Sequence, residues 1–258
     1  MKELLEDATA GDPIRGTKWT LKSLRKLSKT LRGRGFKIGY ESVGRLLRSL
    51  GYSLRVNRKC LSKRRDPERD EQMRYLARQR QAFMKAGKPA VSVDTKKKEQ
   101  IGAFKNPGKT WCQEPKQVLV TDFPNDADGK AIPYGVYDMQ RNRGFVVVGV
   151  SHETAEFAVN AIGRWWQKEG QGRYPDATEL LIQADSGGVN SRRSWLFKWE
   201  LQKFADETGL MITVTHFPTG ASKWNWIEHR LFNHISQNWQ GEPLITFETV
   251  LKFIRTTK

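Results

Sequence analysis

The sequence has few cysteines and no long hydrophobic run. Its two cysteines, Cys60 and Cys112, lie far apart and have no partner at zinc-finger spacing, which excludes a disulfide framework and a structural zinc site. No stretch approaches the roughly 18 uncharged apolar residues of a membrane-spanning helix. The N-terminal residues include Glu3, Glu6 and Asp7 and lack the basic-then-apolar layout of a signal peptide. We therefore expect a cytoplasmic protein with reduced thiols and no membrane partner.

Acidic residues are scarce relative to basic ones. The chain has 45 Lys and Arg against 28 Asp and Glu, a net charge of +17. Residues 1–88 carry 24 basic and 9 acidic side chains, whereas residues 89–258 carry 21 and 19. Basic residues that only improved solubility would be spread more evenly. The charge therefore favours a polyanionic partner, and nucleic acid over a membrane, because no stretch pairs a basic face with a strongly hydrophobic one.

The N-terminal third has the pattern of two short basic helices. Apolar residues recur at helical spacing in residues 20–31 and 42–50, with Lys and Arg on the other faces. Glycines between the segments favour a turn, so we predict an all-α helix-turn-helix DNA-binding region over residues 1–56, with a plain helical hairpin as the alternative. The basic side chains expected to contact DNA are Lys22, Arg25, Lys26, Arg45, Arg48, Arg55 and Arg58.

A basic connector is predicted over residues 57–88. It begins with a stretch dense in Lys and Arg and continues as a polar, Arg-rich helix at about residues 68–86. We expect this connector to lie on DNA between the helix-turn-helix region and the next domain.

The pattern after Lys88 indicates alternating strands and helices. Strands are predicted at residues 90–93, 132–139, 144–150, 180–184 and 211–215. Helices are predicted at residues 154–168, 194–207 and 247–255, and a further one carries Glu228 in its early turns and runs to about residue 238. This order predicts an α/β domain over residues 89–258, a mixed five-stranded sheet flanked by helices.

Carboxylates at the ends of these strands are the candidate metal-binding residues. Asp94 ends the first strand, Asp185 ends the fourth, and Glu228 lies in the first turns of a helix that follows a Pro/Gly turn. Open α/β sheets build their sites in loops at strand ends, and buried carboxylates need a cationic partner. Mg²⁺ prefers such hard oxygen ligands. Each carboxylate alone could still be an ordinary turn or helix-start residue.

Three sequence blocks carry a resemblance to a known family. The segments VSVDTKKKE (91–99), IQADSGG (182–188) and NWIE (225–228) resemble the signature blocks of DDE transposases of bacterial insertion sequences, specifically the Rhodopirellula-type group. The resemblance implies a ribonuclease H-like catalytic domain. It also implies a catalytic triad of Asp94, Asp185 and Glu228 that holds two Mg²⁺ ions, with Mn²⁺ as a substitute. By the same resemblance Asp94 bridges the two ions, Asp185 binds one of them and Glu228 binds the other.

The resemblance further implies the reaction and the partners. Such an enzyme cuts double-stranded DNA at the ends of its element and joins the freed 3′-hydroxyl to target DNA, as a homo-oligomer of at least two copies near the bacterial nucleoid. Lys96, Lys97 and Lys223 are expected to contact phosphates near the site. Family members typically continue further, so the catalytic domain is expected to be truncated at its C-terminus. Another ribonuclease H-like nuclease, or an inactive remnant that only binds DNA, remains the alternative.

Two further expectations concern side chains around the site. Asp138, within a predicted strand, is expected to be structural and is the first substitute if one of the three carboxylates is misassigned. Trp165, Trp195 and Trp199 lie in amphipathic segments and are expected in the core.

Overall fold

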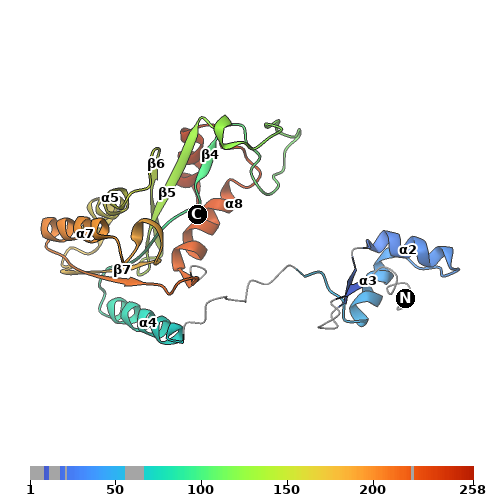
Figure 1. Cartoon of the computed structure of the whole chain (residues 1–258), viewed down its shortest axis with the longest axis horizontal. Helices are drawn as coiled ribbons and strands as arrows, with labels where there is room; N and C mark the ends of the chain where they lie inside the picture. The colour runs from blue at the N-terminus through green and yellow to red at the C-terminus, as the bar shows by residue number, and fades with distance from the viewer. Residues whose placement is uncertain (1–8, 12–17, 21, 56–66, 222–223) are drawn as a thin grey trace. The chain divides into compact units, whose positions relative to one another are not determined.

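The chain forms two compact units, Met1–Leu61 and Ser62–Lys258. The computed structural model describes residues 9–11, 18–20, 22–55, 67–221 and 224–258 (Figure 1). Two of the predicted DNA-contact residues, Arg58 and Lys223, lie outside these residues. No helix within the described ranges is long and apolar enough to cross a membrane.

The N-terminal unit contains a hairpin as well as two helices. Strands β1 (Thr9–Gly11) and β2 (Lys18–Thr20) pair antiparallel ahead of helices α2 (Leu24–Gly33) and α3 (Tyr40–Ser49). The prediction that this region is all-α is therefore wrong. Helix α2 begins after residue 20 because β2 engages residues 18–20 and Ser23 caps the helix, accepting a hydrogen bond from the Lys26 amide at 3.2 Å.

A small core holds helices α2 and α3 together. Leu27, Leu31 and Val43 are buried between them. The Ser28 hydroxyl donates to the Ile38 carbonyl at 2.8 Å, which ties α2 to the loop before α3. Gly35 reverses the chain with a φ of 89°, a conformation that favours glycine. Both predicted helices are confirmed, and their apolar faces meet each other.

The second unit is built on a mixed sheet that contains all five predicted strands. In spatial order these are β6 (Arg143–Gly149), β5 (Gly129–Asp138), β3 (Ala90–Thr95), β7 (Glu179–Ala184) and β8 (Met211–His216). β3, β7 and β8 run parallel, whereas β5 is antiparallel to its neighbours β3 and β6. A sixth, unpredicted strand β4 (Glu99–Ile101) pairs with the start of β5. The predicted ribonuclease H-like sheet is confirmed.

Helices cover both faces of this sheet (Figure 1). One face packs against α5 (Ala155–Trp165) and α7 (Trp195–Thr208), and α5 continues into the π-helix η2 (Trp166–Gly170) and α6 (Gln171–Arg173). The other face packs against α4 (Arg69–Lys85), the π-helix η5 (Glu228–Phe232), α8 (Asn233–Asn238) and α9 (Phe247–Thr256). Two short 3₁₀ helices, η1 (Pro124–Asp126) and η3 (Gly188–Asn190), lie in loops.

Helix α4 belongs to the second unit and confirms the helix predicted at about residues 68–86, whereas residues 57–66 of the predicted connector lie outside the described residues. Leu76 and Phe83 of α4 are buried. The Gln183 side chain of β7 donates to the Leu76 carbonyl at 3.0 Å, and Arg69 donates to the Gly220 carbonyl at 3.2 Å. The many Arg residues of α4 made its sequence look polar throughout, yet Leu76 and Phe83 pack it against the rest of the unit.

Candidate active site

The first two candidate carboxylates lie side by side at one edge of the sheet. Val93 of β3 and Ala184 of β7 are register partners in a parallel pair, and Asp94 and Asp185 are the next residues along each strand. Neighbouring strands are about 4.8 Å apart, so the two aspartates leave adjacent strands at the same level. Asp94 is buried with 9% exposure, and Asp185 is partly buried.

Glu228 reaches the same edge because its helix sits unusually close to the sheet. Glu228 is the first residue of η5, and Gly135 of β5 is the register partner of Asp94. A Cβ atom on Gly135 would lie 2.6 Å from Phe232 Cε1 and 2.8 Å from Ile227 Cδ1, which is too close. Only glycine therefore allows this helix to pack directly over the strand position opposite Asp94.

The three carboxylates share one electrostatic environment. Burial, then the charges of Asp185 and Glu228, raises the pKa of Asp94 to about 7, although hydrogen bonds from Thr95 and Asn225 oppose the change. Burial also raises the pKa of Asp185 and that of Glu228, and the charge of Asp185 adds to the effect on Glu228. Clustered carboxylates whose pKa values rise in this way lack sufficient compensating positive charge.

The donor set fits Mg²⁺ or Mn²⁺. All three candidate ligands are hard carboxylate oxygens, the kind that these ions prefer. In the part of the chain that the structure describes, no three His, Cys, Asp or Glu side chains form a ready-made metal site. A bound ion would therefore need to draw the carboxylates of Asp94, Asp185 and Glu228 together, and their mutual repulsion would be relieved when it did.

Lys96 differs from the surface lysine that the sequence suggested. It is only 7% exposed, and its Nζ lies 2.5 Å from Glu99 Oε1 and 4.5 Å from the centre of the Trp239 ring. Its charge lowers the pKa of Glu228, although burial raises that pKa more. The charge of Lys96 thus acts on Glu228 from a buried position, where the side chain also contacts Glu99.

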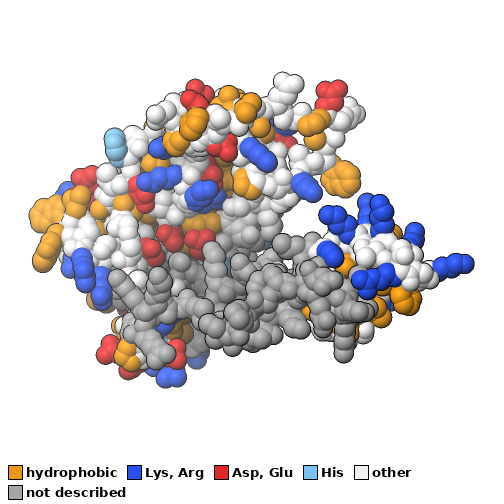
Figure 2. Space-filling view, turned by 45° about the vertical axis from the view of Figure 1, so that its right-hand side comes forward, with side chains coloured by type: hydrophobic (Ala, Val, Ile, Leu, Met, Phe, Trp, Pro, Cys, Tyr) orange, Lys and Arg blue, Asp and Glu red, His pale blue; other side chains and the backbone are white. Residues whose placement is uncertain are grey.

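The other predicted DNA-contact residues that can be described lie at the surface or near it. Figure 2 shows Lys and Arg side chains grouped on the visible face of the N-terminal unit. Arg45 also donates to the Ser42 hydroxyl at 3.1 Å, and Arg25 lies 5.8 Å from the Tyr40 ring centre. Lys22 is partly buried. The exposed members of the set are Arg25, Lys26, Arg45, Arg48, Arg55 and Lys97.

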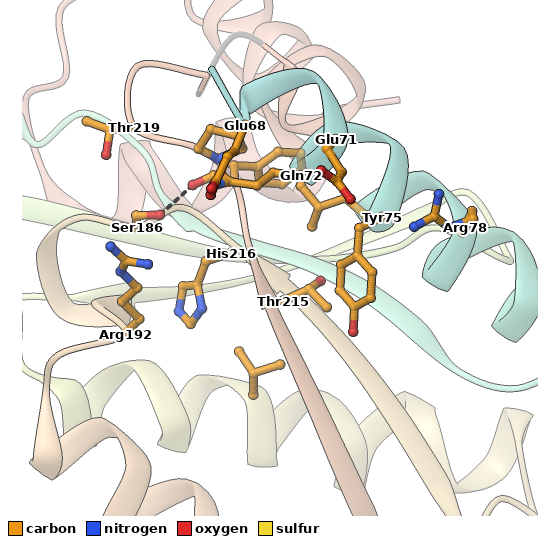
Figure 3. A pocket seen from close by; sticks show the side chains of 14 residues that line it. Glu68, Glu71, Gln72, Tyr75, Arg78, Ser186, Arg192, Thr215, His216 and Thr219 are labelled. Atoms are coloured by element: carbon orange, nitrogen blue, oxygen red, sulfur yellow. Dashed lines mark hydrogen bonds between the residues drawn. The ribbon is translucent and has the colours of Figure 1, made fainter. Parts of the chain in front are cut away.

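A polar cavity of about 630 Å³ adjoins the loop that follows Asp185. Figure 3 shows Gln72 and Tyr75 of α4 on one side and Arg192 and His216 on the other. His216 Nε2 lies 2.8 Å from the Asn190 carbonyl, so this nitrogen donates. Burial lowers the pKa of His216, which favours the neutral ring. Sequence patterns did not reveal this cavity because it depends on the packing of α4.

Asp138 has a structural role, as predicted from the sequence. It is fully buried, and its Oδ1 accepts hydrogen bonds from the Gln140 and Arg141 amides at 3.0 Å each. The Tyr174 hydroxyl lies 2.9 Å from both carboxylate oxygens. These partners stabilise the turn after β5.

The fold of this chain is shared by solved structures of a transposase. The chain is similar to the Mos1 transposase in its paired-end complex with the left transposon end, with a TM-score of 0.54 and 15% identity over 91% of this chain and 66% of that one. It is also similar to Mos1 in its strand transfer complex, with a TM-score of 0.51 and 14% identity over 91% and 65% of the two chains. The chain therefore spans about two thirds of the length of these Mos1 chains. No curated protein sequence matches it.

The family assignment comes from the whole sequence. The family model described as the Rhodopirellula transposase DDE domain matches residues 1–258. This match agrees with the mixed sheet and with the three carboxylates gathered at one of its edges. The chain belongs to the Rhodopirellula-type DDE transposase family.

Proposed function

We propose that this protein cuts DNA at the ends of a mobile element and joins the freed 3′-hydroxyl to target DNA. The observation that carries the proposal is the gathering of Asp94, Asp185 and Glu228 at one sheet edge, where the charges of the last two raise the pKa of the first. Two divalent ions held by such carboxylates supply an activated oxygen nucleophile and stabilise the leaving oxygen of an in-line displacement.

Asp94, Asp185 and Glu228 would hold these ions, in the division that the family resemblance implies, and their carboxylate oxygens would supply the negative charge that binds them. The charge of Lys96 favours the ionised form of Glu228, which is the form that binds a cation. Because water and a DNA hydroxyl are the nucleophiles, the protein forms no covalent intermediate.

The N-terminal unit supplies the proposed grip on double-stranded DNA. Its exposed Arg and Lys side chains suit contacts with phosphates on either side of a groove. The Mos1 complexes that share this fold include a paired-end complex with a transposon end. By analogy we propose that at least two copies of this chain hold a pair of element ends at the bacterial nucleoid. Gel filtration that found one copy for every two ends would contradict this assembly.

The test is nicking and end joining on a plasmid that carries the flanking element ends, in Mg²⁺ or Mn²⁺. The intact chain is compared with Asp94→Ala, Asp185→Ala and Glu228→Ala, with DNA binding measured in parallel. We expect each substitution to remove cleavage and joining while binding persists.

Each of the other outcomes would indicate a different activity or a different set of catalytic residues. Cleavage without joined products would identify a ribonuclease H-like nuclease. An intact chain that binds DNA but neither cuts nor joins it would identify a DNA-binding remnant of a longer transposase. Cleavage retained in all three variants would exclude the proposed carboxylates.

A further inference from the structure

A buried chain of hydrogen bonds connects Ser92, Asn225 and Asp94. Ser92 and Asn225 are both fully buried. The Ser92 hydroxyl donates to Asn225 Oδ1, and Asn225 Nδ2 donates to Asp94 Oδ2 at 3.2 Å. With the amide reversed, its oxygen would face the carboxylate and repel it. The Asp94 carboxylate, which only accepts, therefore fixes which end of the Asn225 amide faces it, and the Ser92 hydroxyl holds the other end.

The backbone of Asn225 also contacts the third carboxylate residue. The Glu228 amide donates to the Asn225 carbonyl at 3.2 Å, at the point where the loop enters the helix. One residue thus binds Asp94 through its side chain and Glu228 through its backbone. The spacing between these two residues depends on where Asn225 is held, and Ser92 of β3 holds it.

The chemical nature of this contact suits a metal site. An amide is neutral, so it orients the Asp94 carboxylate and leaves its negative charge available to attract a cation. A lysine in the same place would neutralise that charge. The Thr95 amide donates to the other oxygen, Asp94 Oδ1, at 2.8 Å. Each Asp94 oxygen then keeps a lone pair for a metal ion. Partners of this kind orient the ligands of known metal sites and tune their affinity.

We propose that Asn225 is a positioning residue that sets the Asp94 carboxylate and the start of the Glu228 helix in the geometry for metal binding, with Ser92 holding the oxygen of its amide. This inference rests on the proposed metal-dependent function. It assigns a task to two residues, one in the first and one in the third sequence block, that are not themselves ligands.

The test measures Mn²⁺ binding to the full chain by calorimetry, without DNA, and thermal melting of each metal-free variant. Asn225→Ala removes both side-chain bonds, and we expect Mn²⁺ affinity to fall about 10- to 100-fold. Ser92→Ala should weaken binding several-fold, because the buried Asn225 oxygen then loses the hydroxyl that holds it, whereas Ser92→Thr keeps the hydroxyl and should bind normally. Asn238→Ala is the matched control, since Asn238 donates to the Phe253 carbonyl and contacts no carboxylate among the described residues.

The outcomes separate this inference from the function beneath it. Wild-type Mn²⁺ affinity in a folded Asn225→Ala chain would overturn the inference alone. If Asn225→Ala does not fold, the comparison of Ser92→Ala with Ser92→Thr decides, and equal affinities overturn it. An intact chain that binds no Mn²⁺ would overturn both the proposed metal function and the inference.

Discussion

The two units use charged residues in opposite ways. Met1–Leu61 has 15 basic and 5 acidic residues, and its described core has three buried apolar side chains with four partly buried ones around them. The charged side chains described in this unit therefore stay at or near the surface. Ser62–Lys258 has 30 basic and 23 acidic residues and two large core clusters. This larger unit buries Asp94, whose pKa rises, and Lys96, whose charge lowers the pKa of Glu228. A small core leaves charged side chains exposed, where they can bind a partner. A large core can bury several of them side by side, where they can bind a metal ion.

The largest effect is expected from removing the exposed charges of the small unit. Replacing Arg25, Lys26, Arg45 and Arg48 with Ala should lower DNA affinity at least 100-fold near physiological salt, because the protein then neutralises fewer phosphates and releases fewer counterions. The logarithmic salt slope should fall by about 3 to 4. Fluorescence anisotropy at several salt concentrations measures both. An unchanged slope would place the DNA contacts elsewhere.

The second effect concerns a buried charge of the large unit. Burial raises the pKa of Asp94 from its ordinary 3.8 to about 7. Between these pH values the folded, metal-free chain keeps a proton that the unfolded chain has released, so the free energy of unfolding falls as pH rises. Asp94→Asn cannot ionise and should be more stable than the wild type at pH 8, on the order of 3 kcal/mol.

Urea unfolding in EDTA at two pH values checks this prediction. At about pH 4 the two chains should have similar free energies of unfolding, since Asp94 is then mostly protonated when folded. Added Mg²⁺ should stabilise the wild type at pH 8 and have less effect on Asp94→Asn. A wild type that is the more stable chain at pH 8 without metal would contradict the raised pKa.

A smaller effect is expected where the helix of Glu228 meets the sheet. Gly135→Ala puts a methyl group against Ile227 and Phe232, so the helix must shift and metal-dependent nicking should fall about 10-fold. Gly172→Ala is the matched control, because nothing lies within 4 Å of its new Cβ atom. DNA affinity should be unchanged in both. Normal nicking by Gly135→Ala would mean that the exact seat of this helix is unimportant.

The smallest effect compares the same interaction in the two units. Ser23 caps α2 in the small unit, and Thr154 caps α5 in the large one, each accepting a backbone hydrogen bond. Replacement by Ala should cost about 1 kcal/mol in either place. Calorimetry should show the larger fall in melting temperature for Ser23→Ala, because a smaller unit has a smaller unfolding entropy. Equal shifts would indicate that the two units unfold together.

The sequence predicted the sheet well because its strands carry strong local signals. Buried apolar runs bounded by turns identified β3, β5, β6, β7 and β8. Strand β4 was missed because its three residues include Glu99 and Gln100 and it forms only by pairing with β5. The β1 and β2 hairpin was missed for a similar reason, since strands this short depend on their partner and not on their own pattern.

The sequence named the candidate carboxylates but gave little of the geometry around them. The three sequence blocks named Asp94, Asp185 and Glu228, but the pairing of Ser92 with Asn225 depends on a contact between distant segments. Ser92 and Asp94 are two residues apart in β3 and so lie on the same face of the strand. This is the one feature of the local sequence that points to their shared contact with Asn225. Of the three tryptophans expected in the core, Trp165 is fully buried, whereas Trp195 and Trp199 are 81% and 62% exposed. Helical spacing alone does not say which face a tryptophan occupies.

The most direct test of this account measures DNA affinity and Mg²⁺-dependent nicking together in two variants of the full chain. One is the quadruple Ala variant of Arg25, Lys26, Arg45 and Arg48, and the other is Asp185→Asn. We predict that the first loses affinity but nicks normally once DNA is saturating, and that the second binds normally and does not nick. Nicking by Asp185→Asn at the wild-type rate would contradict the account, because the chemistry would then lie outside the three carboxylates.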